Sequence, residues 1–370
     1  MNNAKNIIRL SKSCIGESEK KAVLEVLDKE YLGMGAEVNS FENELSQFFN
    51  RSAVCVVNGT AALHLSLQAA NISRGDEVLV PSLTYVASFQ AISSTGARPI
   101  ACDIDPITCL LDIFDAEKKI TSKTKAIMPV HYTGYCGDLD LIYNFAKKYK
   151  LRVIEDAAHA FGSHYKNRLI GSFGDIACFS FDGIKNITSG EGGCVVTNNS
   201  KILSRIKDAR LLGVERDSEK RFSGKRSWDF DVKKQGWRYH MSDIMAAIGR
   251  QQLKKYSSFA SKRKNIAEYY NNLFKSCKNI KPIVSDFNNI VPHIYVIRVL
   301  GMKNRRNIQS RMLDKGIQVG YHYQPNHLLS YFSLHNKVSL PATEAIFPEL
   351  LSLPLHPDLS LENVDFIFKS

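Results

Sequence analysis

Short apolar runs alternate with helical patterns between residues 50 and 200, and this alternation is the strongest structural signal in the chain. The runs are apolar at consecutive positions, as in strands buried on both faces, and the segments between them are long enough for crossover helices. We therefore expect an α/β fold with a largely parallel sheet covered by helices on both sides, in which a hairpin-like return makes one of the last two strands antiparallel. The pattern predicts strands at 53–57, 77–80, 98–102, 126–130, 151–154, 176–180 and 193–197, and helices at 60–70, 88–94 and 139–150.

A different pattern follows the sheet region. Residues 242–275 contain no glycine or proline after Gly249, which predicts one long helix that bridges two domains. We expect a large domain over residues 1–250 and a smaller α+β domain over residues 251–370. The elements predicted for the smaller domain are a strand at 291–299, a helix at 305–315 and a strand at 317–323.

Composition narrows the class of protein. The 370 residues are 44% hydrophobic and 23% charged, as in an ordinary globular protein. The first residues lack the apolar core of a signal peptide, and no apolar run reaches about 18 residues, so we expect neither secretion nor a membrane span. The eight cysteines are scattered without a C-x-x-C pair, which favours small core residues in a reducing cytoplasm over a metal site or disulfides.

The formal charge of +12 is compatible with a nucleic acid, a membrane surface or an anionic substrate as partner. The densest basic stretches, 201–225 and 250–264, also contain acidic residues and lack interleaved aromatic residues, so they are typical of solvated helix faces. An anionic substrate is therefore the favoured interpretation, and we expect no nucleic-acid partner.

Lys185 stands on a loop between two predicted strands, and this loop leads into the glycine pair at residues 192 and 193. Asp156 ends an earlier buried strand, about thirty residues upstream. An amine and a carboxylate in these places suit a Schiff base to a pyridine aldehyde, with the acid on the ring nitrogen. The alternatives are a solvated loop lysine and an aspartate that caps a helix.

Five further positions fit a phosphorylated ring. Thr60 and Ala61 open a predicted helix, where backbone N–H groups favour an anion, and the hydroxyl of Ser180 ends a strand nearby. His159 is placed to contact a ring hydroxyl, and Tyr85 to stack on the ring. Each residue also has an ordinary structural explanation, as a serine bonded to a neighbouring carbonyl, a packed histidine or a core tyrosine.

Taken together, these segments resemble the DegT/DnrJ/EryC1/StrS group of sugar aminotransferases, which are fold-type-I enzymes dependent on pyridoxal 5′-phosphate (PLP). The resemblance covers nearly the whole chain. It rests on residues 58–65, 81–87, 153–160, 171–175 and 179–193, which occur in the order expected for the group.

The resemblance implies a role for each residue named above. Lys185 would form the Schiff base and carry the proton in transamination, and Asp156 would face the pyridine nitrogen. The remaining cofactor contacts would be His159 at the ring hydroxyl, Tyr85 on the ring face, and Thr60, Ala61 and Ser180 at the phosphate. The resemblance further implies glutamate as amino donor and a nucleotide-linked 3-keto or 4-keto hexose as acceptor. The product would be an amino sugar for a surface polysaccharide, lipopolysaccharide or secondary metabolite, made by a homodimer whose sites contain residues of both chains.

One motif departs from the group. Residues 236–241 read Gly-Trp-Arg-Tyr-His-Met, so Arg238 replaces an asparagine that reaches the cofactor phosphate of the partner subunit, and His240 replaces an arginine. Arg238 suits three partners: that phosphate, a carboxylate or diphosphate of an unusual substrate, or a surface acid. A sugar-acid acceptor such as 8-oxo ketodeoxyoctonate therefore stays open.

The substrate side has weaker candidates. His322 and Tyr323 fall where members of the group close over the sugar, and Gly33 and Met34 lie in a loop that relatives place near the active site. A dehydratase or epimerase on the same cofactor is disfavoured because Lys185 is present. A non-catalytic sensor is disfavoured because no DNA-binding motif occurs in the sequence.

Overall fold

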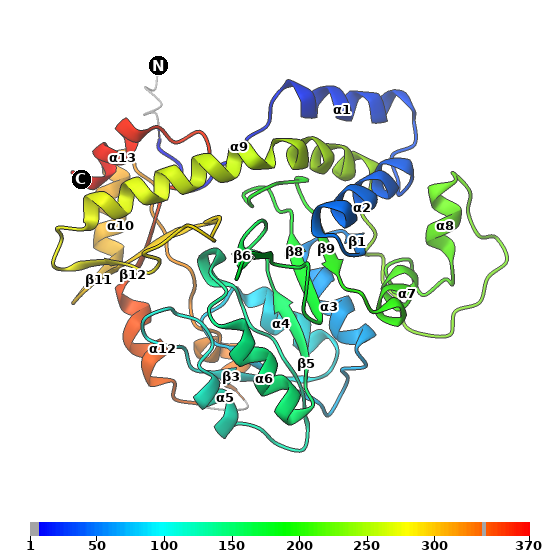
Figure 1. Cartoon of the computed structure of the whole chain (residues 1–370), viewed down its shortest axis with the longest axis horizontal. Helices are drawn as coiled ribbons and strands as arrows, with labels where there is room; N and C mark the ends of the chain where they lie inside the picture. Colours follow the sequence, from blue (N-terminus) through cyan, green and yellow to red (C-terminus); the bar gives the residue numbers. More distant parts are fainter. Residues whose placement is uncertain (1–6, 335–337) are drawn as a thin grey trace.

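A seven-stranded sheet forms the centre of the computed structural model, which describes residues 7–334 and 338–370 (Figure 1). Its strand order is β1-β9-β8-β5-β4-β2-β3. All seven strands predicted from the apolar runs are present, with some ends shifted by a few residues. Their bounds are β1 Ala53–Val56, β2 Glu77–Pro81, β3 Arg98–Cys102, β4 Thr124–Ile127, β5 Arg152–Asp156, β8 Ile176–Ser180 and β9 Gly193–Val196.

The direction of the strands places the chemistry-bearing segments at one edge of the sheet. Strand β9 pairs antiparallel with both β1 and β8, whereas the other neighbouring pairs are parallel. The expected return strand is therefore confirmed. The carboxyl ends of β1, β2, β4, β5 and β8 consequently lie along the same edge, where ligands bind in open α/β sheets.

Helices cover both faces of this sheet, which explains why β2 and β8 are buried along their whole length. Local polar groups begin some of them: Asn58 Oδ1 accepts the N–H of Ala61 at the start of α3 (2.8 Å), and Asp138 caps α6. The bounds are α1 Glu17–Asp28, α2 Ala36–Phe49, α3 Gly59–Ala69, α4 Val86–Ser94, α5 Ile113–Lys118, α6 Leu139–Tyr149, α7 Ser200–Ala209 and α8 Asp217–Phe222; a two-stranded ribbon is formed by β6 His164–Tyr165 and β7 Arg168–Leu169.

The predicted long helix is α9, Asp243–Phe274, which begins at the capping residue Ser242. It runs along the molecule from α1 and α2 towards α13 (Figure 1). Its first turns contribute Ala246 to the core below α2, and its last turns contribute Tyr270 and Phe274 to a separate core. One helix thus joins two clusters of buried apolar side chains.

The second core surrounds a three-stranded sheet of order β10-β11-β12. The prediction of a strand at 317–323 is wrong: this segment makes only single bridges, Ile8 to Ile317 and Gly320 to Ser352, before it turns towards the main sheet. The domain division at residue 250 stays a prediction. The elements are β10 Ile280–Pro282, β11 Tyr295–Val299, β12 Leu350–Leu353, α10 Arg305–Asp314, α11 Ser330–Ser333, α12 Pro341–Ile346 and α13 Leu361–Phe368.

Two further features concern the described part of the chain as a whole. Across residues 7–334 and 338–370, the structure contains no helix with the length and apolar character needed to cross a membrane. The eight cysteines are free thiols, and six of them are buried.

Candidate active site

A cavity of about 490 Å³ opens at the carboxyl ends of the main-sheet strands. Its wall combines the start of α3, the segment after β2, the ends of β5 and β8, and the loop between β8 and β9. Eight of the residues predicted to form the site line it: Thr60, Tyr85, Asp156, His159, Ser180, Lys185, His322 and Tyr323. Segments far apart in the sequence therefore meet as the strand order requires.

Lys185 reaches this cavity from the loop between β8 and β9. The loop is folded back on itself, because Phe181 donates its N–H to Gly192 (2.7 Å) and accepts that of Ser189 (2.8 Å). Burial lowers the pKa of Lys185 from 10.5 to about 8, and the nearby carboxylates of Asp156 and Asp182 limit this shift. At pH 7 about a tenth of the amine is therefore uncharged, far more than for a lysine with the usual pKa of 10.5, and the uncharged form is the one that acts as a nucleophile.

Asp156 ends β5 with its carboxylate buried and held from two sides. The hydroxyl of Ser88 donates to Oδ2 (2.7 Å), and the backbone N–H of Ala158 donates to Oδ1 (3.2 Å). Thr84 extends the chain of hydroxyls through its contact with Ser88 (3.0 Å). The orientation of the carboxylate is thus fixed before any ligand arrives.

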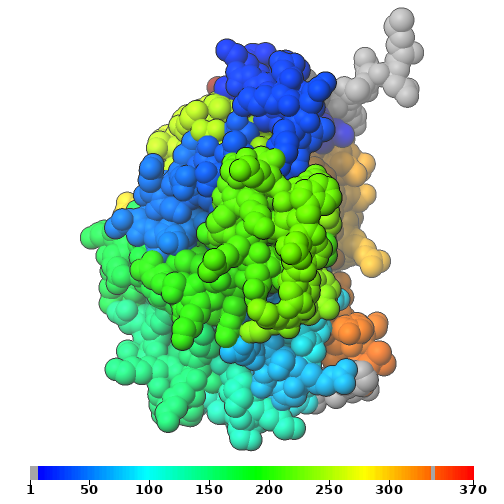
Figure 2. Space-filling view, turned by 90° about the vertical axis from the view of Figure 1, so that its right-hand side faces the viewer, coloured from blue at the N-terminus to red at the C-terminus, as the bar shows by residue number. Residues whose placement is uncertain are grey.

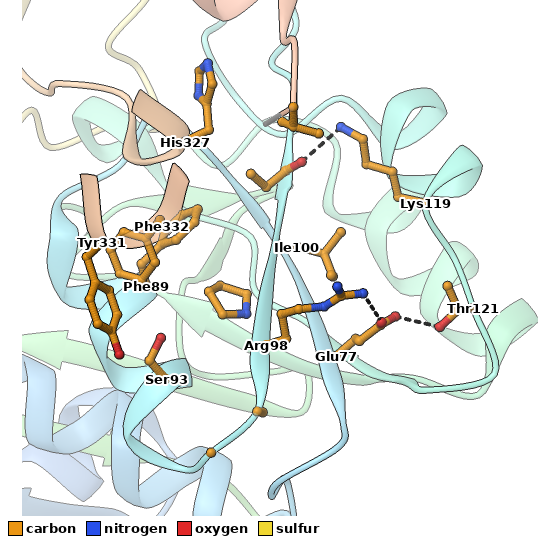
Figure 3. A pocket seen from close by; sticks show the side chains of 15 residues that line it. Glu77, Phe89, Ser93, Arg98, Ile100, Lys119, Thr121, His327, Tyr331 and Phe332 are labelled. Carbon is orange, nitrogen blue, oxygen red and sulfur yellow. Dashed lines mark hydrogen bonds and ion pairs between the residues drawn. The ribbon is translucent and has the colours of Figure 1, made fainter. Parts of the chain in front are cut away.

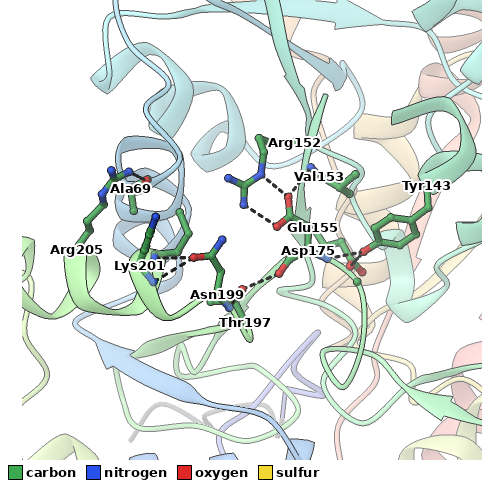
Figure 4. A network of polar contacts seen from close by, with 12 residues as sticks. Ala69, Tyr143, Arg152, Val153, Glu155, Asp175, Thr197, Asn199, Lys201 and Arg205 are labelled. Atoms are coloured by element: carbon green, nitrogen blue, oxygen red, sulfur yellow. Dashed lines mark hydrogen bonds and ion pairs between the residues drawn. The ribbon is translucent and has the colours of Figure 1, made fainter. Parts of the chain in front are cut away.

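A polar network behind Asp156 secures β5 against β8 (Figure 4). Arg152 forms a bidentate ion pair with Asp175 at 2.7 and 2.6 Å. Glu155 is almost fully buried. Its carboxylate lies 2.7 Å from Nε2 of His131 and accepts a hydrogen bond from the hydroxyl of Tyr143. These contacts belong to the scaffold, because Arg152, Glu155 and Asp175 do not line the cavity.

Another part of the cavity wall consists of aromatic rings, those of Tyr85, His159, His322 and Tyr323. Nε2 of His159 lies 2.9 Å from the hydroxyl of Tyr323, and burial together with the charge of Lys185 lowers the pKa of His159 well below its usual value. Tyr85 is 57% exposed, and its ring centroid lies 5.4 Å from that of Tyr323. A ring exposed at a cavity mouth is available to cover a ligand. His322 is held by Ser352 (2.7 Å), and burial lowers its pKa to about 4.

The start of α3 lies unusually close to the end of β8. A Cβ atom at Gly59 would come within 2.8 Å of Cβ of Ser180, so only glycine permits this approach. The hydroxyls of Thr60 and Ser180 border the cavity beside this contact. Ala61 does not line it, because its side chain is buried and its N–H is used by the Asn58 cap. Sequence reasoning overlooked that this N–H already has an acceptor.

Besides Ala61, three predicted substrate or cofactor contacts do not reach the cavity of their own chain. Met34 is fully buried in the core of the main domain, which corrects its assignment to substrate, and Gly33 lies in the same loop away from the cavity wall. Arg238 is exposed and lies beside His240 at a small separate cavity of about 120 Å³. Its expected reach to a partner subunit's site stays a prediction.

Four residues near the amine and carboxylate were missed: Ser88, Asp182, Glu191 and His293. Ser88 belongs to α4, and its contact with Asp156 crosses 68 residues. His293 belongs to the segment before β11, and its Nε2 lies 3.3 Å from Nζ of Lys185 across 108 residues. No spacing rule connects positions so distant, although Asp182 and Glu191 flank Lys185 in the sequence and were available to inspection.

A second cavity of about 510 Å³ lies at the edge strand β3 and contains none of the predicted residues (Figure 3). Its charged groups are already paired: Arg98 with Glu77 (2.5 Å), and Lys119 with the carbonyl of Ala101 (2.9 Å). Lys119 and Pro99 leave this exposed edge with few free hydrogen-bonding groups, which protects it from pairing with other strands. We assign it no chemistry.

Comparison with known proteins decides the identity of the site. The model of the DegT/DnrJ/EryC1/StrS aminotransferase family matches residues 13–370. The chain belongs to this family. As an aminotransferase of the family it is a PLP-dependent enzyme with the fold-type-I architecture, as the resemblance implied.

Relatives of the aminotransferase agree over nearly their full length. GDP-perosamine synthase of Escherichia coli O157:H7 is 38% identical, with 95% of this chain and 94% of the relative covered. The spore coat polysaccharide biosynthesis protein SpsC of Bacillus subtilis is 34% identical, with 96% and 94% covered. The PLP form of Spr1654 from Streptococcus pneumoniae superposes with a TM-score of 0.91 at 31% identity, covering 98% of this chain and 97% of that one. The aminotransferase is therefore similar to enzymes of amino-sugar and polysaccharide biosynthesis.

Proposed function

We propose that this enzyme transfers the amino group of glutamate to a nucleotide-linked keto sugar, a 3-keto or 4-keto deoxyhexose, in the synthesis of an amino sugar for a surface polysaccharide. The observation that carries the proposal is the single cavity that brings together the amine of Lys185 and the fixed carboxylate of Asp156. A reducing compartment such as the cytoplasm suits the eight free thiols.

The residues around the cavity fit PLP. The start of α3 and the hydroxyls of Thr60 and Ser180 would hold the phosphate, in the narrow contact that Gly59 permits. Asp156 would accept the N–H of the pyridine ring, and the unpartnered Nδ1 or the Nε2 edge of His159 would face its hydroxyl. When bound, PLP supplies an electron sink that makes a substrate C–H bond acidic.

The chain's own groups then have distinct tasks. Nζ of Lys185 would hold the cofactor through its aldehyde group, and as a free amine it would accept and return a proton as general base and acid. The carboxylate of Asp156 keeps its partner nitrogen protonated. Tyr85 covers the mouth of the cavity and excludes water, while His322 and Tyr323 border the space left for the sugar.

Both candidate acceptors are anionic, since a nucleotide-linked sugar carries a diphosphate and a sugar acid a carboxylate. Asp182 and Glu191 line the wall, and among the described residues of this chain Lys185 is the one strong cation that does so. Either anion would therefore need a cation from elsewhere, such as Arg238 of a second copy, and the choice between the two acceptors rests on the relatives. The relative GDP-perosamine synthase, at 38% identity, is named for a nucleotide-linked sugar, and this supports the nucleotide-linked class.

We further propose a homodimer in which each chain completes the other's site. The segment between α7 and α9 spreads over one face of the molecule beside α1 and α2 (Figure 2). Large apolar side chains are exposed on both parts: Leu24 and Leu27 on α1, and Leu212, Trp228, Phe230 and Val232 in the segment. Large apolar side chains exposed on these two elements favour a protein interface, and Arg238 belongs to the same segment as four of them.

A panel of acceptors tests the function. Purified enzyme with PLP is supplied with glutamate and, in turn, a nucleotide-linked 4-keto sugar, a nucleotide-linked 3-keto sugar and an 8-oxo sugar acid, and 2-oxoglutarate is measured. We expect turnover with one of the nucleotide-linked sugars and none in a Lys185→Ala variant. The surface variant Lys264→Ala, outside the cavity, is the matched control. Turnover by Lys185→Ala, or with the sugar acid alone, contradicts the proposal.

A further inference from the structure

The side chain of Lys185 lies against His293, a residue next to the three-stranded sheet. Nζ of Lys185 lies 3.3 Å from Nε2 of His293, which precedes β11 and is 2% exposed. His293 does not line the cavity wall, so it meets the lysine from behind. A buried imidazole in this place is available to the amine and not to a ligand.

The backbones that carry the two side chains are fixed to each other. The guanidinium of the buried Arg263 in α9 donates to the carbonyls of His293 (3.0 Å), Lys185 (3.4 Å) and Ile184 (3.4 Å). The side-chain amide of Asn186, next to Lys185, donates to the carbonyl of Val291 (3.1 Å). Two independent links therefore hold the lysine loop against the segment of His293 and set the distance between their side chains.

The ring of His293 is also restrained. It packs against the ring of His159 with centroids 4.5 Å apart, and His159 is itself held by Tyr323. Burial and the adjacent Lys185 lower the pKa of His293 well below its usual value, so the imidazole is neutral. An ammonium group can only donate a hydrogen bond, and therefore Nε2 accepts from Lys185 whenever the lysine is charged.

We propose that His293 is a positioning residue for Lys185, whose Nε2 accepts an N–H of the lysine and holds Nζ at the cavity while the amine gains and loses its proton. The inference rests on the proposed role of Lys185 as the proton carrier. It adds a residue that acts through the lysine and touches neither cofactor nor substrate.

The test measures the titration of Lys185 itself, in full-length protein freed of PLP. Modification of Lys185 by an amine-reactive acylating reagent is followed by mass spectrometry across a pH series for the wild type, His293→Phe and His293→Gln. We expect His293→Phe to lower the midpoint by about one pH unit, because the ammonium form loses its acceptor. The glutamine variant keeps an acceptor oxygen and should lie closer to the wild type. Asp156, Asp182 and Arg263, the charged groups that act on Lys185, are unchanged in every variant.

A matched control separates positioning from general packing. His356→Phe replaces another buried histidine with an unpartnered Nδ1, away from the cavity, and should leave the midpoint unchanged. In the PLP-loaded enzyme, His293→Phe should lower kcat about tenfold or more while KM changes little, with partial recovery in His293→Gln. If His293→Phe does not fold, His293→Leu replaces it.

Equal midpoints in the wild type and the phenylalanine or leucine variant overturn the inference, as does a raised midpoint. Equal effects of His293→Phe and His293→Gln also overturn it, since they would leave only a packing role. The midpoint is measured without cofactor or substrate. Failure of the proposed sugar transamination, seen as an inactive wild type with every acceptor, is therefore distinguishable from failure of this inference.

Discussion

Asp156 shows how a single residue is prepared for its partner. Its two oxygens receive hydrogen bonds from Ser88 and Ala158, so the carboxylate enters the cavity in one orientation. Asp156→Asn should lower kcat on the order of a hundredfold or more, because an amide does not keep a pyridine nitrogen protonated. The measurement is glutamate-dependent 2-oxoglutarate formation at saturating PLP.

Ser88→Ala is a milder variant for comparison with Asp156→Asn. It keeps the carboxylate and removes one orienting hydrogen bond, so we expect a loss of about tenfold at most. A Ser88→Ala effect as large as that of Asp156→Asn, or wild-type turnover in Asp156→Asn, would contradict the assigned role of the carboxylate.

Lys185 should also leave a signature in stability. Its pKa is lowered from 10.5 to about 8 by burial, so between these values the folded protein has released a proton that the unfolded chain still binds. The free energy of unfolding of PLP-free wild type should therefore rise relative to Lys185→Met as pH increases from about 8 to about 10.5, by at most about 1.4 kcal/mol per pH unit. Urea denaturation across this window measures the difference. A constant or falling difference would show that burial does not depress the titration of Lys185.

At the scale of elements, α3 and β8 lie so close together that no side chain fits at Gly59. Gly59→Ala would place a Cβ 2.8 Å from Cβ of Ser180, which pushes the helix start away from the strand end and weakens the phosphate site. We expect PLP affinity to fall about tenfold or more, since the displaced groups include charge-assisted donors. PLP titration followed by absorbance gives the dissociation constant.

A double-mutant cycle isolates the steric cause. Ser180→Gly removes the Cβ and the hydroxyl together, so adding Gly59→Ala in that background should cost much less than it does in the wild type. If Gly59→Ala has the same effect in both backgrounds, the contact with Ser180 is not the reason glycine is required.

The elements that were predictable are those whose signal is local. Apolar runs fixed the seven strands, and their order at one sheet edge explains why Thr60, Asp156 and Ser180 meet. The segment 317–323 alternates apolar and polar residues like a half-buried strand, but it makes only single bridges, through Ile317 and Gly320, and is not a strand. The burial of Met34 could not be predicted either, because it depends on how α2 packs over the sheet and not on the residues next to it in the sequence.

At the scale of the molecule, the site depends on contacts that cross both sheets. His293 and Tyr323 come from the region of the three-stranded sheet, yet they meet Lys185 and His159 of the main sheet. Such pairs follow from the path of α9 and from the buried Arg263 that it carries. The main elements of the fold and the family motifs could be predicted from the sequence. The distant residues that contact Lys185 could be identified only in the folded structure.

The exposed apolar surface of α1 and of the segment between α7 and α9 gives the last prediction. If this surface joins two copies, Leu24→Glu with Trp228→Glu should convert a dimer to a monomer, because placing a charge at a buried apolar contact costs about 2 kcal/mol or more and weakens association at least about thirtyfold per site. PLP affinity should fall with it, since Arg238 would no longer reach a partner's site. Light scattering after size-exclusion chromatography measures the mass. Phe114→Glu, a charge at an equally exposed aromatic residue on α5, is the control that should leave the dimer intact. A monomeric wild type, or a dimer that survives both substitutions, would contradict the proposed interface.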